Sequence, residues 1–193
     1  MNGVSNILLF VASCLFAQNI VFVRLLGSCT LGENRRVETA AGYGLAMTAV
    51  TTLSSALVWM VEKWALAPLD AQFLRLPAYV LVILLSSWIV ARLAAKLLPG
   101  LADVLSVSLA PLAANSAVLG IAILNLEAGC GFGQALASGF LGGLGFLMAV
   151  VLMAGVQERL EFSKVPEPLK GVPIALISAS LIALAFGGFV GLG

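Results

Sequence analysis

The chain has 193 residues, of which 61% are apolar and 10% are charged, with a net charge of +1 and no histidine. Soluble domains carry about 25% charged residues, so this composition argues against a soluble fold, and the near-neutral charge gives no reason to expect a nucleic-acid partner. The absence of histidine removes the commonest general base and metal ligand. The sequence therefore predicts an all-α protein of the lipid bilayer, with residues 1–193 forming a single membrane domain.

Six apolar stretches come close to the roughly 20 residues that a membrane-spanning helix needs. In chain order they cover residues 7–26, 40–61, 77–91, 101–124, 136–156 and 173–190. Polar residues interrupt the first and the fourth stretch where a span should be deepest, at Gln18 and Asn19 and at Asn115 and Ser116. We expect six transmembrane helices, with broken or half-helices in the first and fourth spans.

The ten Lys and Arg residues are distributed unevenly between the two sides of this six-span arrangement. The side that holds both termini and the second and fourth loops carries Lys63 and Arg75. The other side carries Arg24, Arg35, Arg36, Arg92, Lys96, Arg159, Lys164 and Lys170. Because Lys and Arg are enriched in cytoplasmic loops, both termini are predicted to face away from the cytoplasm.

The two halves of the chain, about residues 1–97 and 98–193, resemble each other weakly at an offset of 96–97 residues. Residues 17–19 match 113–115, and residues 74–77 match 170–173. A repeat of three spans enters the membrane from the opposite side the second time, which predicts two inverted repeats. Paired interruptions in such repeats indicate a functional site near the midplane. The alternative is that Asn19 and Asn115 only form hydrogen bonds with neighbouring helices.

Pairs of glycines four residues apart occur in the last two predicted spans. They are Gly139 and Gly143 in the fifth span, and Gly187 and Gly191 in the sixth. Small residues at this spacing let the backbones of two helices approach closely. We therefore expect a close helix contact at each pair.

Several segments along the chain resemble the RnfA/NqrE-like family of integral membrane proteins, which is found in the Rnf electron-transport complex and in the sodium-pumping NADH:quinone oxidoreductase. These segments are Leu-Leu-Gly-Ser-Cys at 25–29, Asn-Ser-Ala-Val-Leu-Gly at 115–120, Gln-Glu-Arg-Leu at 157–160, Val-Pro at 165–166 and Ala-Leu-Ile-Ser at 175–178. The resemblance covers essentially the whole chain in order. It implies a six-span protein of the bacterial inner membrane, with inverted three-helix repeats and half-helices at its centre. In that membrane, the orientation predicted from Lys and Arg places both termini in the periplasm.

The resemblance also implies a function within a complex. An Rnf complex transfers electrons between ferredoxin and NAD and couples this transfer to ion transport across the membrane. The implied role is that of a membrane subunit, without activity alone, which pairs with a homologous, RnfE-like subunit of opposite topology. Since the sequence has neither a nucleotide-binding loop nor a CxxCxxC ferredoxin run, flavin, NAD and the other iron–sulfur centres are expected on partner subunits.

The paired subunits of this family resemble a holder for a shared [2Fe–2S] cluster, to which each contributes two cysteines. One family position, in the Leu-Gly-x-Cys segment, maps onto Cys29, and the other maps onto Ser116, where this sequence departs from the pattern. Three alternatives remain open. Ser116 binds iron through its oxygen, which is a harder donor than a thiolate, or another group supplies the fourth ligand, or the cluster differs. Cys14 is conceivable as that other group, whereas Cys130 is predicted on the opposite side of the membrane.

Two further functions remain alternatives to an electron-transfer subunit. Inverted repeats with paired broken helices are also typical of small secondary transporters. The other alternative is a structural scaffold subunit without a cluster. The serine at position 116, where the family has a cysteine, favours this alternative. If a cluster is bound, Asn19 and Asn115 are the candidates for the hydrogen bonds that tune its reduction potential.

Overall fold

The computed structural model of the chain describes residues 19–24, 26–27, 36–68, 72–97, 115–163 and 165–188. These residues are helical or lie in turns, and they contain no strand. In chain order the elements are α2 (Val37–Val61), the π-helix η3 (Glu62–Leu66), η4 (Gln72–Leu74), α3 (Arg75–Leu97), α6 (Ser116–Glu127), α7 (Phe132–Glu161), η5 (Glu167–Leu169) and α8 (Val172–Gly187).

The described helices are those of a membrane protein. The stretches Val37–Leu66, Arg75–Ala94 and Phe132–Glu161 are long and apolar enough to cross a membrane, while α6 and α8 are shorter apolar helices. The second, third and fifth predicted spans are therefore found as helices. The third helix continues to Leu97, six residues beyond the predicted end of that span.

In the first and fourth predicted spans, the asparagines at the polar positions are not helical, which corrects the boundaries of these two spans. Residues 19–24 form turns, and Gly27 adopts a positive φ of 75°. Asn115 has an extended backbone (φ −74°, ψ 117°), so α6 begins only at Ser116. Asparagine interrupts a helix because its short side chain offers the backbone an alternative hydrogen-bond partner. Residues 7–18 and 101–114 lie outside the described part.

Helices α2 and α7 form the central pair of the fold and run antiparallel. A Cβ atom added at Gly139 would lie 2.9 Å from the Thr51 carbonyl oxygen, and one added at Gly143 would lie 2.6 Å from the Thr48 Cα. Later residues of α7 therefore meet earlier residues of α2, as expected for antiparallel helices. This confirms the close contact predicted at Gly139 and Gly143. At Gly187, no atom of the described residues beyond the adjacent backbone lies within 4 Å of a Cβ built there, and Gly191 lies outside the described residues, so the prediction for that pair stays a prediction.

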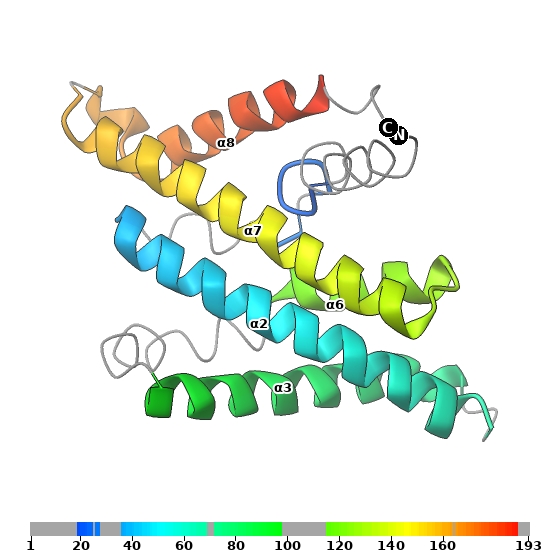
Figure 1. Cartoon of the computed structure of the whole chain (residues 1–193). Helices are drawn as coiled ribbons and strands as arrows, with labels where there is room; N and C mark the ends of the chain where they lie inside the picture. The colour runs from blue at the N-terminus through cyan, green and yellow to red at the C-terminus, as the bar shows by residue number, and fades with distance from the viewer. Residues whose placement is uncertain are drawn as a thin grey trace, which may run out of the picture.

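The helices α3, α2, α7 and α8 lie in this order across the molecule, and α6 packs against α2, α7 and α3 (Figure 1). The hydroxyls of Ser54 in α2 and Ser86 in α3 are hydrogen-bonded to each other, and both residues are fully buried. The helices α3 and α8 lie at the two ends of this row of described helices. Large apolar side chains are exposed on both of them, for example Leu81 in α3 and Leu184 in α8. Such faces suit a surrounding bilayer, whose hydrocarbon needs no polar contacts.

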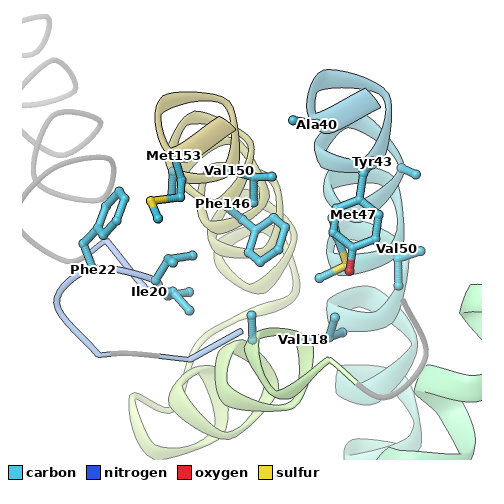
Figure 2. Packing of buried hydrophobic residues seen from close by; sticks show 14 of the residues in the cluster. Ile20, Phe22, Ala40, Tyr43, Met47, Val50, Val118, Phe146, Val150 and Met153 are labelled. Carbon is cyan, nitrogen blue, oxygen red and sulfur yellow. The ribbon is translucent and has the colours of Figure 1, made fainter. Parts of the chain in front are cut away.

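A single apolar cluster fills the space between α2, α6, α7 and the turns at 19–24. Figure 2 shows Ile20 and Phe22 from the turns on the side of Met153 of α7, and Val118 of α6 below Phe146 and Met47. The ring of Tyr43 from α2 lies 6.0 Å from that of Phe146 from α7. The core therefore packs directly around the two interrupted segments and holds them in place.

Candidate functional site

The side chain of Asn19 connects the first interrupted segment to the middle of α7. Asn19 is fully buried. Its Oδ1 accepts hydrogen bonds from the backbone N–H groups of Val21 (3.0 Å) and Phe22 (3.2 Å). Its Nδ2 donates to the carbonyl oxygen of Gly145 at 3.1 Å. One carboxamide thus closes the turn that follows it and attaches that turn to a central helix.

Asn115 has the equivalent role in the second half of the chain. Its exposed fraction is 2%. Its Oδ1 accepts a hydrogen bond from the backbone N–H of Ala117 at 2.9 Å, which makes it the N-cap of α6. Its Nδ2 donates to the Tyr43 hydroxyl at 3.4 Å. Asn19 is therefore attached to α7, and Asn115 to α2.

The two interrupted segments meet where Gly27 contacts the start of α6. The Gly27 N–H donates to the Ser116 Oγ at 2.9 Å. A Cβ at Gly27 would lie 2.8 Å from the Asn115 Oδ1 and 2.9 Å from the Phe146 ring, and the positive φ of Gly27 is one that glycine adopts readily. We call the group of Asn19, Gly27, Asn115 and Ser116 the asparagine junction. It joins segments that are 89 residues apart in sequence.

The electrostatics of the asparagine junction favour a negatively charged group at position 116. Ser116 is the first residue of α6 and is exposed, although Asn115 before it is buried. The N-terminus of a helix carries a partial positive charge of about half an elementary charge. The Gly27 N–H adds a directed donor to the same oxygen. An anionic oxygen at this position, such as a metal-bound alkoxide, would be stabilised by both.

Neither cysteine that was predicted as a possible ligand lies in the described part of the chain. Cys29 and Cys14 lie outside the described residues. Cys130 lies in the turn after α6, where its carbonyl oxygen accepts a hydrogen bond from the Trp59 indole at 3.0 Å. Ser116 and Cys130 lie at opposite ends of α6, whose 12 residues correspond to about 18 Å of helix. Within the described ranges, no three His, Cys, Asp or Glu side chains gather to hold a metal.

Tyr43 belongs to the site, although no sequence pattern predicted it there. Its ring is buried, with an exposed fraction of 2%, and its hydroxyl accepts the hydrogen bond from Asn115. The sequence does contain one indication, a tyrosine inside an apolar span. A buried tyrosine hydroxyl needs a hydrogen-bond partner. Which residue supplies that partner depends on the packing of α2 against α6.

Comparisons with known proteins agree with this membrane fold. A family described as "Rnf-Nqr subunit, membrane protein" matches residues 7–193. The chain is 41% identical over 189 residues to the A subunit of the ion-translocating oxidoreductase complex of Azoarcus sp., covering 97% of this chain and 98% of the relative. It is 42% identical to the A subunit from Citrobacter koseri over 187 residues, 96% of each chain. The A subunit from Cereibacter sphaeroides is 42% identical over 181 residues, 93% of this chain and 94% of the relative.

Proposed function

This chain belongs to the Rnf-Nqr family of membrane proteins, and from that premise we propose that it is the A subunit of a bacterial ion-translocating oxidoreductase complex. The observation that carries the proposal is the similarity to such A subunits over nearly the full length of both chains. In this role the chain takes part in electron transfer between ferredoxin and NAD that is coupled to ion transport across the inner membrane. Flavin and NAD are bound by partner subunits, and the chain has no activity alone.

The proposed topology is six spans in two inverted three-helix repeats, about residues 1–97 and 98–193, with both termini in the periplasm. Three observations support it. The central helices α2 and α7 occupy equivalent places in the two repeats and run antiparallel. Asn19 and Asn115 lie at equivalent positions, and each caps the turn that follows it. Each also donates to the central helix of the other repeat, Asn19 to α7 and Asn115 to α2.

We also propose that the asparagine junction forms this chain's part of a [2Fe–2S] site shared with a homologous subunit of opposite topology. The support is that Gly27, two residues before Cys29, bonds to Ser116. The two segments that the family resemblance identifies as ligand-bearing are therefore in contact. When bound, such a cluster accepts and passes on one electron.

The residues of this chain have three tasks in that site. Cys29 supplies a thiolate. The two asparagines fix the segments that carry the ligand positions, and their hydrogen bonds make them positioning residues. The Phe146 ring packs against Gly27 and shields that side of the site from water, while Ser116 is exposed. An apolar wall of this kind controls solvent access and the local dielectric.

The test of the proposed function is Cys29→Ala in the complex purified with its membrane partners. We expect the variant complex to assemble and to lose the electron paramagnetic resonance and visible signals of one [2Fe–2S] cluster, with two fewer iron atoms per complex. Cys130→Ala is the matched control, because that residue lies at the far end of α6, and its iron content should equal that of the wild type. Unchanged iron in Cys29→Ala would instead support the scaffold function, and substrate uptake by the isolated chain in liposomes would support a transporter.

Ser116 gives a second prediction about the same site. If its oxygen binds iron, Ser116→Ala should lower iron affinity about 10-fold or more, because even the loss of groups that support a metal ligand costs 10–100-fold. Ser116→Cys should restore iron binding and raise the midpoint potential, since a thiolate is a softer donor than an alkoxide. Redox titration followed by electron paramagnetic resonance measures both. An unchanged spectrum in Ser116→Ala would mean that the fourth ligand comes from elsewhere.

A further inference from the structure

The two asparagines of the asparagine junction differ in the group that accepts their hydrogen bond. Asn19 donates to a backbone carbonyl oxygen, that of Gly145 in α7. Asn115 donates instead to a side chain, the hydroxyl of Tyr43 in α2, at 3.4 Å. Every residue type offers a backbone carbonyl, whereas the acceptor in α2 exists only because position 43 is a tyrosine. The second half of the junction is therefore attached to α2 through one particular side chain.

Tyr43 is packed so that it holds Asn115 in one orientation. Its exposed fraction is 2%, and its ring lies 6.0 Å from the ring of Phe146. A carboxamide has a donor end and an acceptor end. With the Tyr43 hydroxyl accepting from Nδ2, the Oδ1 of Asn115 faces the backbone N–H of Ala117, 2.9 Å away. The hydroxyl thus supports the cap at the start of α6.

The ring of Tyr43 connects the same residue to the other segment of the junction. Phe146, against which the ring packs, lies so close to Gly27 that a Cβ added there would be 2.9 Å from its Cε2. Gly27 in turn donates its N–H to the Ser116 Oγ. The hydroxyl of Tyr43 therefore supports the residue before Ser116, and its ring packs behind the group that donates to Ser116.

We propose that Tyr43 is a positioning residue of the [2Fe–2S] site and influences its reduction potential through Asn115. This inference rests on the proposed function. Tyr43 fixes Asn115, which caps α6 and keeps the positive end of that helix beside Gly27. An electron that enters the site adds a negative charge, which a helix N-terminus stabilises. Loss of the Tyr43 hydroxyl loosens this end of α6, so the site should become harder to reduce.

The test is Tyr43→Phe in the complex purified with its membrane partners. Redox titration followed by electron paramagnetic resonance measures the midpoint potential of the signal that Cys29→Ala removes. We expect unchanged iron content and a lower midpoint potential. At a fixed potential, the ratio of reduced to oxidised cluster should fall about two- to five-fold, the usual effect of a helix terminus on a nearby charge.

Tyr79→Phe is the matched control, because it removes the same atom from an equally buried tyrosine. Tyr79 is 1% exposed, and its hydroxyl donates to the Glu62 carboxylate at 2.8 Å. Glu62 follows the last residue of α2, whereas Tyr43 lies in the second turn of that helix. The control therefore breaks a buried tyrosine hydrogen bond at the opposite end of α2, and its midpoint potential should equal that of the wild type.

A combination of variants tests whether Tyr43 acts through Asn115. Asn115→Ser keeps a capping oxygen but cannot reach the Tyr43 hydroxyl, so Tyr43→Phe should cause no further change of midpoint potential in that background. Thermal unfolding of the wild type, the two single variants and the double variant gives a readout that does not involve the cluster signal. The two losses should be less than additive, because residues that share a hydrogen bond are coupled. Additive losses would overturn the proposal.

The remaining outcomes separate this inference from the proposed function. A midpoint potential of Tyr43→Phe equal to that of the wild type would overturn the inference, as would an equal shift in Tyr79→Phe. If Tyr43→Phe does not assemble, Asn115→Ser decides, because it breaks the same hydrogen bond and should lower the potential in the same way. Failure of the proposed function would be seen instead as unchanged iron and an unchanged signal in Cys29→Ala.

Discussion

Replacing Gly143 by leucine should prevent the chain from folding stably in the membrane. A Cβ at this position would lie 2.6 Å from the Cα of Thr48, and that backbone atom cannot rotate away. Even a single added methyl group in a packed interior costs about 1–3 kcal/mol, and a leucine adds four carbon atoms between α2 and α7. Because total stability is only about 5–15 kcal/mol, we expect almost no monodisperse protein in detergent, as measured by size-exclusion chromatography.

A pair of alanine variants in the same helix provides the control. Gly143→Ala should lower the thermal unfolding temperature, because its Cβ meets α2. At Gly133, in the first turn of α7, an added Cβ has no atom of the described residues within 4 Å. Gly133→Ala should leave the temperature unchanged or raise it slightly, since alanine favours a helix over glycine by up to about 1 kcal/mol. Equal unfolding temperatures for the two variants would contradict a close α2–α7 contact.

The glycine pairs show what a sequence pattern can predict about packing. Gly139 and Gly143 make the predicted close helix contact, and its partner is α2, which the spacing did not identify; Gly187 meets no other helix in the described part of the chain. Spacing indicates that a close approach is sterically allowed. Whether a helix is actually there depends on the order of helices in the fold, and among the described helices α8 comes at the end of the row, next to α7 (Figure 1). That order is set by contacts distant in sequence, which no local pattern contains.

In the candidate site too, some features were predictable from the sequence and others were not. The positions of Asn19 and Asn115 were predictable, because a carboxamide in an apolar run is conspicuous and the two fall at equivalent places in the repeat. The hydrogen bond between Gly27 and Ser116 was not predictable, since it joins residues that are 89 apart in sequence. Its only local signal is glycine itself, which permits the positive φ of 75° at that turn.

The second large effect is expected for Asn19→Ala. The substitution removes the acceptor of two buried backbone N–H groups, those of Val21 and Phe22, and the donor to Gly145. A buried donor left without a partner costs about 1–3 kcal/mol, so the loss of unfolding free energy should be roughly 2–4 kcal/mol. Asn19→Asp keeps the acceptor oxygen but removes the donor to Gly145. Thermal unfolding of the purified complex measures both variants.

Asn115 allows the capping role to be separated from the contact with α2. Asn115→Ser keeps a side-chain oxygen that caps helices as well as asparagine does, but it is too short to reach the Tyr43 hydroxyl. Asn115→Ala loses both interactions, and removal of an N-cap typically costs about 1 kcal/mol. We therefore expect stability to decrease from wild type through Asn115→Ser to Asn115→Ala. If the two variants are equally unstable, the bond to Tyr43 rather than the cap holds α6 in place, and Tyr43→Phe should then reproduce the whole loss.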